Sequence, residues 1–217
     1  MRTLLWGDQG TVDSVEKELR AGMVVLADGD TVLGLLADVS PQGYAQLDSL
    51  KNRTKKPYLI LVSDKQKAFT LLAKDEFKIL QIEKIMDICW PGPATLIFKA
   101  KPTVPLGVKS SEGTVAIRVP DHAGLLELLQ RFDALYSTSA NTSGKPVPQN
   151  VDEVEESIMN SIACVVLNKH QPDSVLPSTI IDCTGEKIVI VREGAFPTEK
   201  LAGVLNHELL LLRKKNQ

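Results

Sequence analysis

Five polar segments of the sequence carry the residue types that bind anions and orient small ligands. They cover residues 30–35, 51–57, 90–93, 114–118 and 137–144. Each borders an apolar run that reads as a strand, and binding residues gather on such loops. Residues 51–56 hold four cations, which suit a polyphosphate. Arg118 lies on a predicted buried strand, where an arginine needs an anionic partner.

Each segment also has an interpretation that needs no ligand. A basic run is commonly a solvated surface, and a run of serine, threonine, asparagine and glycine is commonly a helix cap or turn. Residues 90–93 favour a rigid turn, and Arg118 is balanced between a structural ion pair and a ligand clamp. Together the segments offer cations, a guanidinium fork and short hydroxyls, without a recognisable covalent nucleophile or general-base pair. This inventory is typical of catalysis by positioning and charge neutralisation, such as nucleotidyl transfer.

Common catalytic motifs are missing from the sequence. It contains no GxxxxGK[ST], GxGxxG, GxSxG or HExxH pattern. The three histidines are far apart, and the three cysteines are widely spaced on apolar segments without a CxxC pair. We therefore expect packed thiols in a reducing compartment, no catalytic side chain acting covalently, and no protein-held metal.

The composition is that of a globular protein. The 217 residues are 43% hydrophobic and 24% charged, which excludes bulk disorder. The 25 basic and 27 acidic residues give a net charge of −2, so nucleic-acid wrapping by bulk positive charge is excluded. The apolar runs are too short to cross a bilayer, and the N-terminus does not resemble a signal peptide. We expect a cytoplasmic protein without a membrane partner.

Helical and strand patterns alternate along the chain. We expect helices over 11–21, 41–50, 75–89, 121–132, 151–160 and 197–213, and strands over 23–27, 58–63, 95–100, 114–119, 134–138, 163–167, 178–183 and 187–192. The alternation predicts an α/β fold with a mixed sheet and flanking helices. Without a long linker or repeat, residues 1–217 are expected to form a single domain, with its motif-bearing core at 23–196 and a C-terminal helical tail at 197–217.

Seven motifs occur in an order that resembles a known family. They are DTVLGL (30–35), KNR (51–53), WPGPATL (90–96), TVAIRVP (114–120), SANTSG (139–144), PSTIID (177–182) and REGA (192–195). In content and order they resemble the YrdC/TsaC family of L-threonylcarbamoyladenylate synthases. The resemblance implies a twisted sheet with an open basic cavity. It also implies condensation of L-threonine, bicarbonate (as CO2) and ATP to threonylcarbamoyl-AMP and pyrophosphate, for t6A modification of tRNA.

The resemblance also implies roles for individual residues. The implied ATP-binding residues are Lys51, Arg53, Thr114, Ser139, Asn141 and Arg192, and the implied threonine-binding residues are Thr31, Arg118, Ser137 and Thr179. Magnesium would accompany ATP without a permanent metal site. The implied partners beyond the substrates are the proteins that transfer t6A, with a further contact to tRNA or RNA.

Two departures from the family pattern bear on the threonine end and one on the ATP end. At the threonine end, the family's Pro-Thr is Asp28-Gly29 here and the following aromatic is Leu33; at the ATP end, Val147 stands where a second ATP-contacting serine is common. We expect the lost threonine hydroxyl to weaken amino-acid binding, Leu33 to alter the pocket wall, and Gly29→Thr to lower the KM for threonine. Two alternatives stay open: a non-catalytic paralogue that binds RNA or ribosomal elements, and an enzyme that passes the carbamoyl group to another acceptor.

Overall fold

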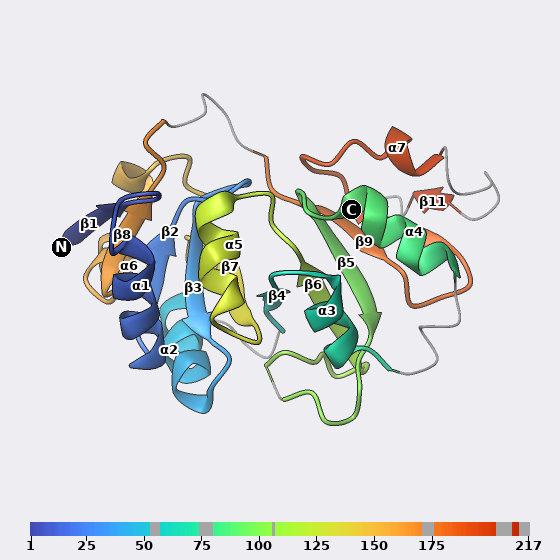
Figure 1. Ribbon diagram of the computed structural model, residues 1–217, viewed down its shortest axis with the longest axis horizontal. Helices are drawn as coiled ribbons and strands as arrows, with labels where there is room; N and C mark the ends of the chain where they lie inside the picture. The colour runs from blue at the N-terminus through green and yellow to red at the C-terminus, as the bar shows by residue number, and fades with distance from the viewer. Residues whose placement is uncertain (53–56, 74–79, 106, 171–175, 203–209, 213–217) are drawn as a thin grey trace.

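The computed structural model describes residues 1–52, 57–73, 80–105, 107–170, 176–202 and 210–212 (Figure 1). Eleven strands form one mixed sheet in the order β1-β8-β2-β3-β7-β4-β6-β5-β9-β10-β11. Their bounds are β1 Arg2–Leu5, β2 Val25–Ala27, β3 Gly34–Asp38, β4 Leu59–Leu61, β5 Ala94–Lys99, β6 Thr114–Arg118, β7 Leu135–Ser139, β8 Cys164–Leu167, β9 Thr179–Asp182, β10 Ile188–Arg192 and β11 Leu210–Leu212. The expected α/β class with a mixed sheet is confirmed.

Helices flank this sheet. Their bounds are α1 Thr11–Arg20, α2 Pro41–Lys51, α3 Lys65–Leu71, α4 Leu80–Cys89, α5 Ala123–Gln130, α6 Glu156–Met159 and α7 Glu199–Ala202, with a 3-10 turn η2 at Val151–Glu153. None of the described helices is long and apolar enough to cross a membrane. Side chains cap three of the helices: Ser40 accepts from the Gly43 N–H, Asp64 from Lys67, and His122 from Leu125.

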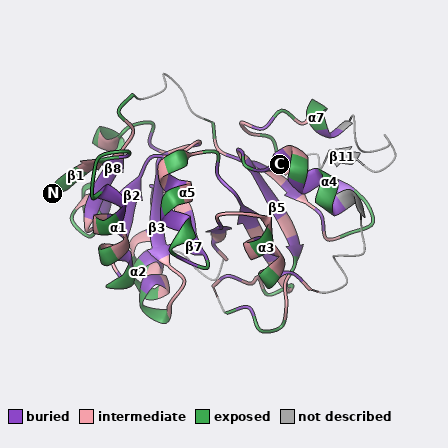
Figure 2. Cartoon of the chain, viewed as in Figure 1, coloured by how far each residue is buried: buried purple, intermediate pink, exposed green. Residues whose placement is uncertain are grey.

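The strands bury apolar side chains on both faces of the sheet. In β2, Val25 and Ala27 join one core cluster and Leu26 joins the other, because neighbouring side chains point to opposite faces. Leu19 of α1 and Leu128 of α5 cover the first face beside β2. Figure 2 shows the resulting buried strands behind helices whose outer sides are exposed.

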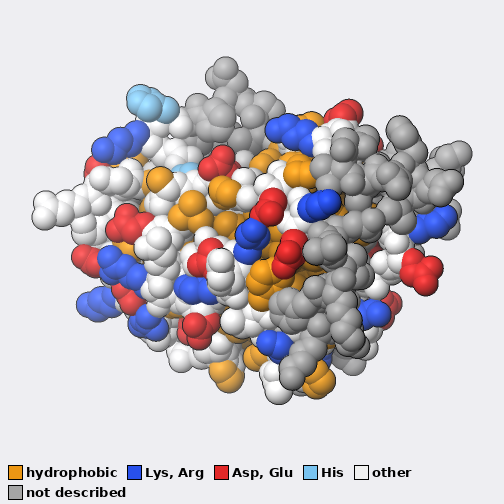
Figure 3. All heavy atoms as spheres, turned by 45° about the vertical axis from the view of Figure 1, so that its right-hand side comes forward, with side chains coloured by type: hydrophobic (Ala, Val, Ile, Leu, Met, Phe, Trp, Pro, Cys, Tyr) orange, Lys and Arg blue, Asp and Glu red, His pale blue; other side chains and the backbone are white. Residues whose placement is uncertain are grey.

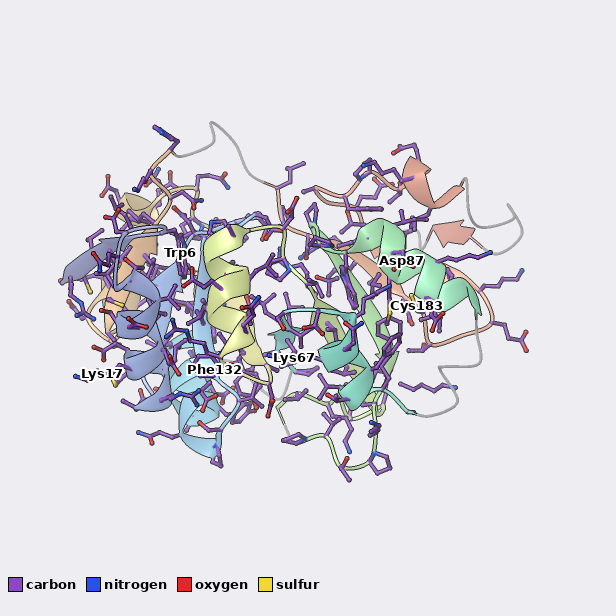
Figure 4. All side chains as sticks on the ribbon, in the orientation of Figure 1. Trp6, Lys17, Lys67, Asp87, Phe132 and Cys183 are labelled. Carbon is purple, nitrogen blue, oxygen red and sulfur yellow. The ribbon has the colours of Figure 1, made fainter. Side chains whose placement is uncertain are left out.

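Lys67 ties α3 to the end of α5 (Figure 4). Its ammonium donates to the carbonyl oxygens of Leu129, at 2.8 Å, and of Phe132. A cation at these carbonyls also complements the negative end of the α5 dipole. The contact fixes α3 against the half of the molecule that carries α5.

Most predicted elements are confirmed to within a few residues, and the differences are local. Strands β1 and β3 and helix α3 were not predicted. The predicted helix over 151–160 is divided into η2 and α6, because Asn150 caps a separate short turn. The predicted C-terminal helix is wrong at Leu210–Leu212, which pair in parallel with β10. Residues 75–79 of one predicted helix, and residues 203–209 and 213 of another, lie outside the described residues.

Candidate functional site

A cavity of about 400 Å³ lies on one face of the middle strands. Alternate residues of the strands line it: Thr95 and Ile97 of β5, Ala116 and Arg118 of β6, and Ser137 and Ser139 of β7. The intervening side chains, such as Leu96 and Ile117, are buried in the core on the opposite face. Period-two alternation therefore places polar and small or apolar side chains on the cavity face and apolar ones in the core on the opposite face.

The cavity is electropositive. Lys51, Arg118 and Arg192 line it, and the described lining residues include no carboxylate. Burial lowers the pKa of Arg118 and of Arg192, and for Arg118 the nearby Asp30 carboxylate opposes that effect. Guanidinium groups keep their charge under such conditions. The lining therefore favours an anionic ligand.

Lys51 ends α2 and holds the loop that follows β7. Its Nζ donates to the Ser139 carbonyl at 2.7 Å, to Asn141 Oδ1 at 3.1 Å and to the Asn141 carbonyl. The next residue, Asn52, has a φ of 45°, which turns the chain out of the helix. The Ser143 N–H closes the arrangement by donating to the Lys51 carbonyl at 3.0 Å. Lys51 therefore shapes this loop and places a buried positive charge behind it.

Arg118 is paired with Asp30 at the end of β6. The Arg118 Nη1 to Asp30 Oδ1 distance is 2.7 Å, and both side chains are more than nine-tenths buried. Asp30 Oδ2 also accepts from the Asp121 N–H at 3.0 Å, which joins the 28–31 loop to the chain after β6. The Arg118 Nε is buried and has no hydrogen-bond partner among the described residues. Because such a donor is costly to leave unpaired, it points to an acceptor supplied by a ligand.

Arg192 connects two of the sequence motifs. Its Nη2 donates to the Ser178 carbonyl at 2.7 Å, and the Ser178 hydroxyl lies 2.8 Å from Thr95 Oγ1. Gly194 allows this approach, because a Cβ there would lie 2.1 Å from the Pro177 carbonyl oxygen. The REGA, PSTIID and WPGPATL motifs therefore meet in one wall of the cavity.

Seven of the ten predicted site residues line this cavity: Thr31, Lys51, Arg118, Ser137, Ser139, Asn141 and Arg192. Arg53 lies outside the described residues. Thr114 and Thr179 are not among the described lining residues, and their expected ligand contacts stay predictions. The Thr114 hydroxyl pairs with Ser110 Oγ at 2.8 Å, and the fully buried Thr179 hydroxyl donates to the Phe196 carbonyl at 2.8 Å.

The departures from the family pattern have structural explanations. Leu33 is buried in the core and does not line the cavity, so the expected change in the pocket wall is wrong. Asp28 points away, accepting from the Asn168 N–H at 3.0 Å. A Cβ on Gly29 would lie 2.9 Å from Leu125 Cδ1, so a side chain there requires the Leu125 methyl to move. Val147 does not line the cavity either.

Four polar lining residues were given no individual role from the sequence. They are Thr95, Thr138, Ser143 and Ser178. Thr95, Ser143 and Ser178 lie inside the quoted motifs and Thr138 lies in the polar segment 137–144, which is the signal that could have found them. Residues 90–93 serve mainly as structure, as expected for a rigid turn. Trp90 is buried and donates to the Ala94 carbonyl at 2.8 Å, one residue before Thr95.

Comparison with known proteins agrees with the motifs. The family model for Sua5, YciO and YrdC proteins, described as telomere recombination, matches residues 17–194. A Methanocaldococcus jannaschii relative is 33% identical over 194 residues, covering 88% of this chain and 89% of the relative. The threonylcarbamoyl-AMP synthase of Pseudomonas entomophila is 33% identical over 185 residues, covering 84% of this chain and 97% of its own.

Solved structures have the same fold. Pyrococcus abyssi Sua5, crystallised with L-threonine, superposes with a TM-score of 0.86 at 25% identity. The match covers 97% of this chain and 62% of the Sua5 chain, so this chain spans under two thirds of that longer relative. The matched family model extends over most of the chain and includes all seven motifs except the last residue of REGA. The chain therefore belongs to the Sua5/YciO/YrdC family.

Proposed function

We propose that this chain is a threonylcarbamoyl-AMP synthase, which condenses L-threonine, CO2 from bicarbonate and ATP. The observation that carries the proposal is one cavity that combines buried cations with the Nε of Arg118, which has no partner in the described part of the chain. An anionic nucleotide and an amino-acid carboxylate can occupy its two ends. The activity named for the Pseudomonas entomophila relative and the threonine bound to Pyrococcus abyssi Sua5 support this assignment.

The nucleotide end consists of Lys51, Arg192 and the loop after β7. Ser139 and Asn141 supply a hydroxyl and an amide for hydrogen bonds, and the two cations offset phosphate charge. Arg53 remains a proposed phosphate ligand from its motif. Magnesium would enter with ATP, bound by phosphate oxygens and water, because the described residues contain no cluster of three or more His, Cys, Asp or Glu suited to a metal.

The threonine end lies around Arg118. Its Nη1 is held by Asp30, which leaves Nε to donate to the substrate carboxylate. Thr31 and Ser137 are buried hydroxyl-bearing residues on the same lining and can bind the threonine amine or hydroxyl. This division places the amino acid deep against β6 and β7.

The reaction needs positioning more than acid–base chemistry. The threonine amine adds to CO2 and loses a proton to solvent, which gives a carbamate. A carbamate oxygen then forms a bond to the α-phosphorus of ATP, and the bond from that phosphorus to pyrophosphate breaks. Holding the two reactants in one cavity converts an encounter of separate molecules into a local step. Lys51 and Arg192 offset the charge that develops on the phosphates. The product would pass to proteins that complete t6A on tRNA.

The face seen in Figure 3 offers less support for the RNA-binding alternative. On the face seen in Figure 3, lysine and arginine side chains alternate with acidic ones around an apolar patch. A sequence-independent RNA site requires a continuous basic surface, and its affinity falls steeply with salt.

Pyrophosphate release tests the proposal. The protein is incubated with ATP, Mg²⁺ and bicarbonate, with or without L-threonine, and alongside a panel of other amino acids. We expect release that depends on L-threonine. Equal release with another acceptor would favour the alternative enzyme, and an ATP-binding protein that releases no pyrophosphate would contradict the proposal.

A further inference from the structure

The last residue of β7 and the loop that follows it supply four residues to the cavity. They are Ser139, Asn141, Ser143 and Gly144. Gly144 has a φ of +88°, a conformation that side chains rarely adopt, so the loop turns sharply here. A loop of this kind keeps its shape only if its polar backbone groups have fixed partners.

Both the oxygen and the nitrogen of the Asn141 side-chain amide form hydrogen bonds within the protein. Its Oδ1 accepts from Lys51 Nζ at 3.1 Å and from the Ser139 hydroxyl at 2.5 Å. Its Nδ2 donates to the Lys145 carbonyl at 2.5 Å. The orientation of Asn141 therefore depends on where the backbone of Lys145 lies.

Glu155 binds this loop from outside the cavity, at the backbone of Thr142 and the side chain of Lys145, and the Lys145 N–H donates to the Thr142 carbonyl at 3.1 Å. Its Oε1 accepts from the Thr142 N–H at 2.8 Å, and its Oε2 accepts from Lys145 Nζ. Glu155 immediately precedes α6, whose Ile158 is fully buried, so the carboxylate is attached to an anchored element. Hydrogen bonds to an ionised carboxylate are stronger than neutral ones, which suits this bracing role.

We infer that Glu155 is a positioning residue for nucleotide binding: by holding Thr142 and Lys145 it fixes Asn141 and the loop that the nucleotide contacts. The inference rests on the proposed function for the identity of the nucleotide. Glu155 does not line the cavity, so it acts through the loop and touches no substrate. Lys51 braces the same loop from the inner side, and the two residues together enclose it.

The test compares Glu155→Ala with Glu155→Gln and with Glu156→Ala as the matched control. Glu156 is exposed and lies beside Glu155 in sequence. Glu155→Ala should weaken ATP binding by calorimetry about tenfold, a factor equal to ~1.4 kcal/mol, and raise the KM for ATP while leaving the KM for threonine unchanged. Glu155→Gln, which keeps an acceptor for the Thr142 N–H, should recover part of the loss.

Amide hydrogen exchange supplies a readout that does not depend on turnover. We expect faster exchange at Thr142 in Glu155→Ala than in wild type or Glu156→Ala. If ATP affinity and Thr142 exchange stay at wild-type values, or if both KM values rise equally in proportion to lost stability, the inference is overturned. Failure of the proposed function is distinguishable, because wild-type protein would then bind ATP without releasing pyrophosphate in the presence of threonine.

Discussion

Replacing Arg118 with lysine separates the two contacts of this side chain. Arg118 is 5% exposed; its Nη1 contacts Asp30, and no described residue accepts a hydrogen bond from its Nε. Lysine keeps a positive charge near Asp30 but has no planar fork to present to a second carboxylate. The variant should therefore lose one charge-assisted hydrogen bond to threonine, worth about 1.5–3 kcal/mol. At ~1.4 kcal/mol for each factor of ten, the KM for threonine should rise about 10- to 100-fold.

The assay is pyrophosphate release, with threonine varied at saturating ATP and then ATP varied at saturating threonine. The KM for ATP should stay near its wild-type value, because the phosphate-facing cations are untouched. Arg118→Ala serves as the contrast: it leaves the buried Asp30 carboxylate without its cation, and breaking such a pair costs about 3–5 kcal/mol. Urea denaturation should therefore show a much larger loss of stability for Ala than for Lys. Equal rises in the KM values for threonine and ATP in Arg118→Lys would refute the proposal that Arg118 binds the threonine carboxylate.

Three further predictions use other parts of the site. Lys51→Ala removes the donor to the Ser139 and Asn141 carbonyls, so it should lower the free energy of unfolding by ~1–3 kcal/mol and weaken ATP binding. Unchanged ATP affinity by calorimetry would contradict the proposed role of Lys51 in offsetting phosphate charge. Gly29→Thr should destabilise the protein in urea rather than improve threonine binding, because its Cβ meets Leu125; a lower threonine KM at full stability would show that the loop accommodates it. The hydrogen bond from Lys145 is the main cause that lowers the pKa of Glu155 from 4.5 to about 2. The ionised Glu155 carboxylate therefore stabilises the folded protein above pH 4.5, and this stabilisation is lost as the pH falls toward 2. The stability difference between wild type and Glu155→Gln should shrink over that range, and a difference that is independent of pH would contradict the ionised contact.

Period and capping signals in the sequence were enough to locate most elements. Ser40 before a proline indicated the start of α2, and the apolar run at 23–27 identified β2. Strand β3 was missed because the DTVLGL motif was interpreted as a loop, although the chain after Gly34 pairs with β7. A helix was expected to extend over 210–212, but the backbone there pairs with β10. Pairing with a distant strand is a tertiary interaction, and sequence periodicity does not report it.

Motif membership and strand alternation predicted which side chains of the candidate site face the cavity. These signals placed Arg118 and Ser139 correctly on the cavity side. They could not show how hydroxyl groups are used: Thr179 lies in a motif, yet its hydroxyl bonds to the backbone of Phe196. Nor could they show that Asp30 is the anionic partner of Arg118, since 88 residues separate the two in sequence.

The most direct test of the central claim is the identity of the nucleotide product. Purified protein is incubated with ATP, Mg²⁺, L-threonine and isotopically labelled bicarbonate, and the nucleotides are separated and analysed by mass spectrometry. We expect threonylcarbamoyl-AMP that contains the label, formed only when threonine is present. Unmodified AMP, or an adenylate without the labelled carbon, from folded protein that binds ATP would contradict the account.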